Sequence, residues 1–311
     1  MALGTNGAAE AGSWKLGGEL LVNRLGYGAM RLPQTGAALT VDAVPGDRDQ
    51  AIGLLRRAVE LGVNHLDTAA FYFSPLRSAN ELINRALAPY PDDLVITTKV
   101  WPGRDACGEW WWAEPQQLRG QVEENLRQLG RDHLDVVNLR VPQRLMTGSI
   151  AEHFGVLAGL RDAGLIRHLG ISNASPAHLA EARASAPVVC VQNPYGLGAP
   201  REETEFLRSC GEQGIAYVPF YAIAGAGREA GATAGAEDAR VTAVARAHDA
   251  SPAQVRLAWT LQQGPHVLAI PGTSDPAHLA ANVAAAALRL TDEEMALLGT
   301  PAGDRPAGST T

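Results

Sequence analysis

The chain has 311 residues, of which 46% are hydrophobic and 19% charged, and its formal net charge is −7. This composition is typical of a globular protein, and the lack of any basic block argues against nucleic acid as a partner. No apolar run approaches the roughly 18 residues of a membrane span, and residues 1–12 do not read as a secretory signal. We therefore expect a cytoplasmic protein with no membrane contact. Cys107, Cys190 and Cys210 lack metal-ligand spacing, which favours reduced thiols.

The first predicted elements are a β-hairpin and a buried strand. Gly17 and Gly18 separate two short runs after Trp14, and residues 25–30 read as the first strand. Apolar side chains recur at helical spacing from 47 to 61, and a glycine follows as the stop signal. The segment 64–69 is predicted as a strand, so Asp67 and Tyr72 should lie where that strand gives way to a loop. His65 in this strand is expected to pack beneath the surface helices.

Strands and helices then alternate through the rest of the chain. Helices are predicted at 80–87, 116–129, 151–163 and 203–210, with three more starting at Ser175-Pro176, Ser251-Pro252 and Asp275-Pro276. Strands are predicted at 94–100, 134–141, 166–172, 188–192, 215–220 and 267–270. The capping box Thr291-Asp-Glu-Glu294 predicts one additional helix near the C-terminus.

Eight strands that alternate with helices predict a (β/α)8 TIM barrel, an α/β fold with an N-terminal β-hairpin and an extra C-terminal helix. We expect residues 1–311 to form a single domain, with flexible tails at 1–12 and 301–311. A doubly wound open sheet is the competing architecture. It is disfavoured because no Gly-x-Gly-x-x-Gly follows the first strand, and the glycine-rich segment 225–235 comes only after the seventh.

The ends of the barrel strands predict a site, because barrel enzymes hold their catalytic residues in the loops that follow the strands. Asp67 and Tyr72 follow the second strand, Lys99 ends the third and Arg140 the fourth. Taken alone, Asp67 is better explained as the cap of the next turn, and Tyr72 as an ordinary half-buried aromatic side chain.

Asp67, Tyr72 and Lys99 together make chemical sense on neighbouring strands. A lysine cation favours the phenolate and lowers the pKa of a tyrosine, while a carboxylate keeps that lysine charged. The three residues therefore predict a Tyr72 phenol that can donate a proton near neutral pH.

At this point an ordered set of motifs resembles the aldo-keto reductases from about residue 25 to 298. The motifs are Asp67-Thr-Ala-x-x-Tyr72, Thr98-Lys99, Gly170-Ile-Ser-Asn173, Gln192, and Ile270-Pro-Gly-Thr273 with Asn282. The resemblance implies an NAD(P)H-dependent oxidoreductase that reduces an aldehyde or ketone to an alcohol without a metal. Tyr72 would be the proton donor, with Lys99 and Asp67 tuning it.

The resemblance also implies a cofactor site. Ser172, Asn173 and Gln192 would hydrogen-bond the nicotinamide carboxamide, and Phe220, next to Tyr221, would stack on its ring. Segment 225–235 would fold over the pyrophosphate, although a plain flexible linker is also compatible with it. Where relatives commonly hold the 2′-phosphate with lysine or arginine, this chain has Gly272, Thr273, Ser274, His278 and Asn282. Hydroxyls and helix-start amides there can still bind phosphate, so we expect NADPH, with weak discrimination against NADH.

Arg140 stands where the family usually has histidine, and three interpretations remain open. It is a forked donor to the substrate oxygen or to an anionic substrate group, a cation that lowers the Tyr72 pKa further, or the mark of a protein with little turnover. A cofactor-binding regulatory protein is thus one alternative function. A lyase that uses Lys99 as a Schiff-base amine is another.

The expected substrate is a small-molecule carbonyl compound. Residues 136–140 and 214–220 resemble a bacterial branch that includes pyridoxal reductases, so a phosphate-free aromatic aldehyde is the first candidate. Met30, Trp101, Trp110 and Trp111 are predicted to line the substrate pocket, although the tryptophans would also serve to pack their loop against the barrel. Asn193 and Tyr195 are weaker candidates for the same pocket. A monomer and a homo-oligomer are both compatible with the sequence.

Overall fold

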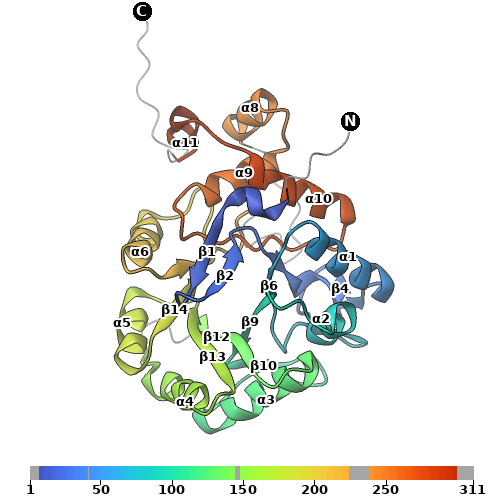
Figure 1. Ribbon diagram of the computed structural model, residues 1–311, viewed down its shortest axis with the longest axis vertical. Coiled ribbons are helices and arrows are strands. Elements are labelled where there is room, and N and C mark those ends of the chain that lie inside the picture. The colour runs from blue at the N-terminus through green and yellow to red at the C-terminus, as the bar shows by residue number, and fades with distance from the viewer. Residues whose placement is uncertain (1–6, 41, 144–147, 224–237, 300–311) are drawn as a thin grey trace, which may run out of the picture.

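Figure 1 shows a central set of strands surrounded by helices, in a computed structural model that describes residues 7–40, 42–143, 148–223 and 238–299. Seven strands form one parallel sheet in the order β15-β14-β13-β12-β9-β6-β3. Their bounds are β3 Tyr27–Gly28, β6 His65–Asp67, β9 Val95–Val100, β12 Leu134–Arg140, β13 Ile166–Ser172, β14 Val188–Gln192 and β15 Ala216–Tyr217.

An eighth extended segment closes the sheet into a barrel. Val267 pairs in parallel with Tyr217 of β15, and Ala269 pairs in parallel with Leu25 just before β3. Backbone hydrogen bonds of 2.9 Å run from the Leu268 N–H to the Tyr217 carbonyl and from the Ala269 N–H to the Arg24 carbonyl. The predicted (β/α)8 architecture is therefore confirmed, with its last strand reduced to a few backbone contacts.

The helices follow the strands as predicted, and several begin at the expected caps. Ser175 and Ser251 each accept a hydrogen bond from the backbone N–H three residues later, and Asp275 caps its helix through two N–H groups. The helices are α1 Arg48–Glu60, α2 Ala79–Leu87, α3 Leu118–Leu129, α4 Ala151–Asp162, α5 Pro176–Ser185, α6 Arg201–Glu212, α8 Ala239–Ala247, α9 Pro252–Leu261, α10 Pro276–Ala284 and α11 Asp292–Gly299. Helix α8 was not predicted. None of the helices among the described residues is long and apolar enough to cross a membrane.

Short hairpins and 3-10 turns complete the fold. The hairpins pair β1 Ser13–Leu16 with β2 Leu20–Asn23, β4 Gln34–Thr35 with β5 Val44–Pro45, β7 Phe73–Ser74 with β8 Arg77–Ser78, and β10 Pro102–Arg104 with β11 Trp110–Trp112. The 3-10 turns are η1 Ala8–Ala11, η2 Ala29–Arg31, η3 Pro115–Gln117 and η5 Ala285–Ala287. Turn η1 lies within the tail predicted at 1–12, and Ala8 is fully buried. Residues 1–6 and 300–311 lie outside the described part of the chain.

The N-terminal hairpin covers one end of the barrel. Leu16, Leu20 and Val22 of this hairpin form one apolar cluster with inward-facing side chains of the strands, such as Val95 and Val136. A larger cluster fills the layer between the strands and the helices. The hairpin closes this end, so any opening to the barrel interior must lie at the carboxyl ends of the strands.

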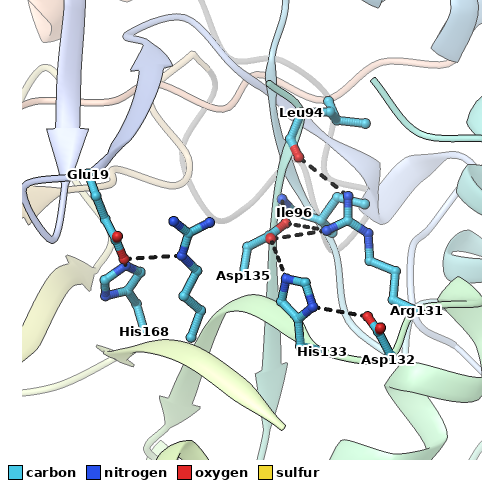
Figure 2. Close-up of polar contacts among 9 residues, drawn as sticks. Glu19, Leu94, Ile96, Arg131, Asp132, His133, Asp135 and His168 are labelled. Carbon is cyan, nitrogen blue, oxygen red and sulfur yellow. Dashed lines mark hydrogen bonds and ion pairs between the residues drawn. The ribbon is translucent and has the colours of Figure 1, made fainter. Parts of the chain in front are cut away.

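Ionic contacts fix the hairpin against the barrel (Figure 2). Glu19 lies in the hairpin turn, and its carboxylate is 3.1 Å from Arg167 Nε and 2.6 Å from His168 Nε2 of β13. Gly17 has φ of +59°, and a side chain there would overlap the His168 ring, so glycine is required. On the neighbouring strand β12, Asp135 accepts a hydrogen bond from the Ile96 N–H at 2.8 Å and forms an ion pair with Arg131. The bond to Ile96 fixes the register of β9 against β12.

Candidate active site

A cavity of about 560 Å³ opens at the carboxyl ends of the strands, opposite the hairpin. Most of the predicted site residues line it: Met30, Asp67, Tyr72, Lys99, Arg140, Gln192, Phe220, Tyr221, Gly272, Thr273, Ser274, His278 and Asn282. The backbones of Gly28 and Gly272 touch at its wall, where a Cβ on either glycine would lie 2.7 Å from a carbonyl oxygen. Residues far apart in the sequence thus meet here because parallel strands all end at the same face.

A buried ion pair lies at the base of this cavity. Lys99 Nζ donates to Asp67 Oδ1 at 2.6 Å and to the Thr68 carbonyl at 3.0 Å, and both charged side chains are almost completely buried. The same ammonium lies 4.9 Å from the centre of the Tyr72 ring. The predicted grouping of phenol, ammonium and carboxylate is therefore present in the structure.

The predicted direction of the Tyr72 pKa was wrong. Burial raises the pKa of this phenol above its ordinary value, and this effect outweighs the lowering by the Lys99 and Arg140 cations. The sequence shows the neighbouring charges but not the depth of Tyr72, a residue that is only 7% exposed. Tyr72 therefore stays protonated at neutral pH, which is the form of a phenol that can donate a proton.

Gln192 contacts the Asp67 carboxylate. Its Nε2 donates to Asp67 Oδ2 at 2.8 Å, and its Oε1 accepts from Asn138 Nδ2 at 3.3 Å. Asn138 Oδ1 in turn accepts the Cys190 thiol at 3.2 Å. Both oxygens of Asp67 are thus engaged, one by Lys99 and one by Gln192, so the position of this carboxylate is fixed beside the ammonium.

Arg140 enters the cavity from the end of β12. Its Nη1 donates to Ser172 Oγ at 3.1 Å, and its guanidinium carbon lies 5.1 Å from the centre of the Phe220 ring. The other N–H groups of this guanidinium form no hydrogen bond with the residues that the structure describes, so they remain available to a ligand. Ser172 and Phe220, which were predicted to hold the nicotinamide, are therefore both in contact with Arg140.

Two helices begin at the cavity wall. Ser251 and Ala253 at the start of α9 and Asp275 and His278 at the start of α10 all line it. The Asp275 carboxylate accepts the N–H groups of Ala277 and His278, which lowers the pKa of this carboxyl. The amides that were predicted to bind a phosphate are therefore already paired with an acidic side chain.

Several predicted residues lie outside the cavity. Ser172 is fully buried behind Arg140, and Asn173 donates to the Val141 carbonyl at 2.8 Å. Asn193 is buried, with its side chain bonded to both the N–H and the carbonyl of Ala174. Tyr195 packs against Trp259 with ring centres 6.0 Å apart. The predicted pyrophosphate loop at 225–235 lies outside the described residues.

The tryptophans do not form the cavity wall. Trp101 has φ of +98°, and its buried ring stacks on His153 at 4.0 Å between ring centres. Trp110 and Trp111 lie in β11, where about two fifths of the surface of each is exposed. Trp110 is nevertheless close to the site, because its ring contacts Phe71 at 5.6 Å and Phe71 contacts Tyr72 at 5.1 Å.

Sequence reasoning missed some lining residues and misplaced one. Arg31, Ser251 and Asp275 line the cavity although no function was predicted for them, and a strand-end or helix-start position was the available signal. His65 was expected beneath the surface helices. Instead it points into the barrel, where Nε2 lies 3.2 Å from Thr97 Oγ1, because side chains on one strand alternate and His65 shares its face with Asp67. Among the described residues, no group of three or more potential metal ligands occurs.

Comparisons with known proteins agree with this geometry. Residues 24–299 match the sequence model described as the aldo/keto reductase family. A pyridoxine 4-dehydrogenase from Escherichia coli is 44% identical over 282 residues, which cover 89% of this chain and 94% of that protein. A methylglyoxal reductase from the same organism is 31% identical over 257 residues, covering 81% of this chain and 84% of the relative.

Solved structures show the same fold. An aldo-keto reductase from Klebsiella pneumoniae, crystallised in complex with NADPH, superposes with a TM-score of 0.75 at 25% identity, covering 93% of this chain and 96% of that one. A thermostable aldo-keto reductase bound to the inhibitor epalrestat gives the same TM-score at 27% identity, covering 92% and 98% of the two chains.

Proposed function

This chain belongs to the aldo/keto reductase family of oxidoreductases, and we propose that it reduces an aromatic aldehyde to the alcohol, with NADPH as cofactor. The observation that carries this proposal is the position of Tyr72 at the cavity, beside the buried Lys99–Asp67 ion pair. A protonated phenol next to a fixed cation can donate to a carbonyl oxygen on which negative charge develops.

The residues of the cavity fit a dinucleotide. The start of α9 faces it, and the positive end of a helix favours phosphate groups, whereas at the start of α10 the Asp275 carboxylate already accepts the N–H groups of Ala277 and His278. Phe220 presents an aromatic face, while Gln192, Thr273 and Asn282 supply polar groups. When bound, reduced nicotinamide supplies the hydride. An NADPH complex of a relative with the same fold supports this choice of cofactor.

Each residue at the base of the cavity has a proposed task in carbonyl reduction. Tyr72 donates its proton to the substrate oxygen, and Lys99 stabilises the phenolate that remains. Asp67 holds the ammonium in place at 2.6 Å and is itself held by Gln192. The same ion pair argues against a Schiff-base lyase, because a lysine held as an ammonium has no free electron pair for attack on a carbonyl.

We infer that Arg140 acts as a donor to the substrate oxygen and as a second cation near Tyr72. Its guanidinium uses Nη1 on Ser172 and keeps other N–H groups for a ligand, whereas a histidine would offer a single neutral donor. Among the charged neighbours of Tyr72, Arg140 also lowers the pKa of the phenol. These are the first two of the three interpretations that the sequence left open.

The substrate class follows from the relative with 44% identity. Its name describes removal of hydrogen from pyridoxine at position 4, and the reverse reaction reduces the corresponding aldehyde. We therefore propose pyridoxal as the first substrate to test. The Phe220 ring and the Arg140 guanidinium at the cavity would suit a flat, heteroaromatic aldehyde.

The test is NADPH oxidation with a panel of aldehydes that includes pyridoxal, benzaldehyde and methylglyoxal. We expect wild type to turn over pyridoxal. The variant Tyr72→Phe should lose turnover by several orders of magnitude while its dissociation constant for NADPH stays within about twofold, because the ring remains and only the acid is lost.

Two outcomes would contradict the proposal. Tight NADPH binding without turnover of any aldehyde would favour a cofactor-binding regulatory protein, and restored turnover in Arg140→His would then identify Arg140 as the cause. Covalent trapping of a carbonyl substrate on Lys99 by borohydride, without NADPH oxidation, would favour the lyase.

A further inference from the structure

A network of buried polar side chains lies behind the catalytic ion pair, on the opposite side of the sheet. Thr68 immediately follows Asp67 in the sequence, and Thr98 immediately precedes Lys99. Because side chains alternate along a strand, the two threonine side chains point away from the cavity and toward the helices. There they meet Asn80 of α2 and Asn125 of α3. All four side chains belong to residues that are fully buried.

The hydrogen bonds of this network form a continuous chain between the two strands. Thr68 Oγ1 donates to Asn80 Oδ1 at 2.7 Å, and Asn80 Nδ2 donates to Asn125 Oδ1 at 2.9 Å. Thr98 Oγ1 donates to the same Asn125 oxygen at 2.6 Å. Asn125 Nδ2 is bonded to the Gln121 carbonyl at 2.9 Å, so neither amide can turn over without breaking several bonds.

Backbone bonds and sequence neighbours connect this network to all three catalytic groups. The Thr68 carbonyl accepts from Lys99 Nζ at 3.0 Å, and the neighbouring residue Asp67 forms the ion pair. On the other side, the Ala79 N–H donates to the Tyr72 carbonyl at 2.9 Å, directly before Asn80. The start of α2 therefore fixes the Tyr72 loop and the end of β6 at the same time.

Packing alone does not account for these polar residues. Around this network, the layer between the helices and the sheet is filled mainly by a continuous cluster of aliphatic and aromatic side chains. Apolar side chains of the same shape would fill this space without the cost of burying polar atoms. A fully satisfied polar network instead rigidifies its surroundings, because each bond has a fixed length and direction.

We propose that Asn80 and Asn125 are positioning residues, which act through Thr68 and Thr98 to hold Asp67, Lys99 and Tyr72 in their reactive arrangement. The proposal rests on the catalytic roles proposed above. Substrate does not reach the asparagines. They therefore affect the position of the Lys99 ammonium relative to Tyr72 and not the binding of substrate.

The test removes the two hydroxyl groups with little change of shape, in the variant Thr68→Val/Thr98→Val. We expect kcat to fall roughly ten- to hundredfold, because small displacements of a catalytic group have effects of this size. The KM for the aldehyde and the dissociation constant for NADPH should change less than about threefold, since uniform binding is not affected. The pH above which kcat declines should rise, because a displaced Lys99 lowers the Tyr72 pKa less.

Thr260→Val is the matched control. Thr260 is also fully buried and donates its hydroxyl hydrogen to the Arg256 carbonyl at 2.9 Å, but it lies in α9 at the end away from the cavity. This variant should lose comparable stability in urea unfolding and keep the wild-type kcat and pH profile. An equal loss of kcat in this control, or an unchanged kcat and pH profile in the double variant, would overturn the proposal.

Thr98→Ser separates positioning from packing, because it loses the buried methyl group and keeps the hydroxyl. We expect it to retain kcat within about twofold despite lower stability. A fall in kcat equal to that of Thr98→Val would overturn the proposal, and these single variants carry the test if the double variant does not fold.

A readout without turnover keeps this proposal distinct from the proposed function. The nitrogen NMR signal of the Lys99 ammonium, assigned by its loss in Lys99→Met, should shift in the double variant and not in Thr260→Val. An unchanged signal would contradict the positioning role of Asn80 and Asn125 even in an active enzyme. Inactivity of the wild type would contradict only the proposed reaction.

Discussion

The charge of Arg140 acts on the acid–base behaviour of Tyr72. Burial raises the pKa of this phenol, and the Arg140 cation is one of the groups that lower it again. Carbonyl reduction needs the protonated phenol, so kcat should decline as the pH rises through the Tyr72 pKa. Arg140→Gln removes the cation, so we expect the decline to begin at higher pH than in wild type, measured as kcat against pH with saturating NADPH.

Arg31→Gln provides the comparison, because Arg31 also lines the cavity but is not among the groups that shift the Tyr72 pKa. Its pH profile should match that of wild type. If Arg140→Gln moved the decline to lower pH, or both variants moved it equally, the direct electrostatic action of Arg140 on Tyr72 would be wrong.

Single residues were predicted well where a strand-end position decided the outcome. Asp67 and Lys99 end neighbouring strands, and the parallel sheet brings them together whatever the intervening loops do. The pKa of Tyr72 was not predictable in this way, because it depends on how deeply the phenol is buried. The contact of Arg140 with both Ser172 and Phe220 was also missed, since sequence spacing says nothing about side-chain conformation.

At the start of helix α10, the charge of the capping residue opposes the binding of a phosphate. Asp275 caps the helix and lines the cavity, and the backbone N–H groups that it accepts keep its pKa low. Serine also caps helices well but carries no charge. We therefore expect Asp275→Ser to bind NADPH several-fold more tightly and NADH about as before, measured by fluorescence titration at low salt.

His278→Ala tests the same helix start in the opposite direction. If the imidazole contributes to holding the 2′-phosphate, this variant should raise the KM for NADPH more than that for NADH. Equal effects on both cofactors would remove His278 from the phosphate site, and tighter binding of both cofactors to Asp275→Ser would mean that the carboxylate does not discriminate between them.

Elements with explicit end signals were predictable, whereas short loop hairpins were not. The Ser-Pro and Asp-Pro starts placed α5, α9 and α10 to within a residue. The hairpin β10–β11 escaped prediction, because it depends on the unusual backbone of Trp101. The backbone at Trp101 directs its ring toward His153. The next three tryptophans lie in β11 and do not line the cavity, so their clustering in the sequence did not indicate a substrate wall.

For the whole molecule, the alternation of strands and helices was sufficient to predict a closed barrel. The eighth strand is held by only a few backbone pairs, and what identified it was its place in the alternation and not its length. The contents of the barrel interior were harder to predict. A short buried strand gives no indication of which of its faces turns inward, and for β6 that choice decides whether His65 contacts helices or the barrel centre.

The position of His65 inside the barrel predicts how the fold responds to acid. Burial lowers the pKa of this imidazole to about 4 from 6.5, while Asp67 raises it and Lys99 lowers it further. Between these two values the unfolded chain binds a proton that the folded barrel excludes, so the free energy of unfolding rises with pH across this window. Across the complete window, this effect contributes up to about 3 kcal/mol to the free energy of unfolding. The contribution is fully present above pH 6.5 and is lost as the pH falls toward 4.

His65→Gln removes the titrating group and keeps a polar side chain that can reach Thr97. We expect this variant to be less stable than wild type at pH 7.5, because the ring leaves a gap in the barrel. Its free energy of unfolding should nevertheless depend less on pH between 7 and 4.5, measured by urea denaturation at each pH. The carboxyl groups titrate in both proteins, so the difference between wild type and variant in the slope of unfolding free energy against pH reports His65 alone. Equal slopes would mean that this imidazole is protonated inside the folded barrel.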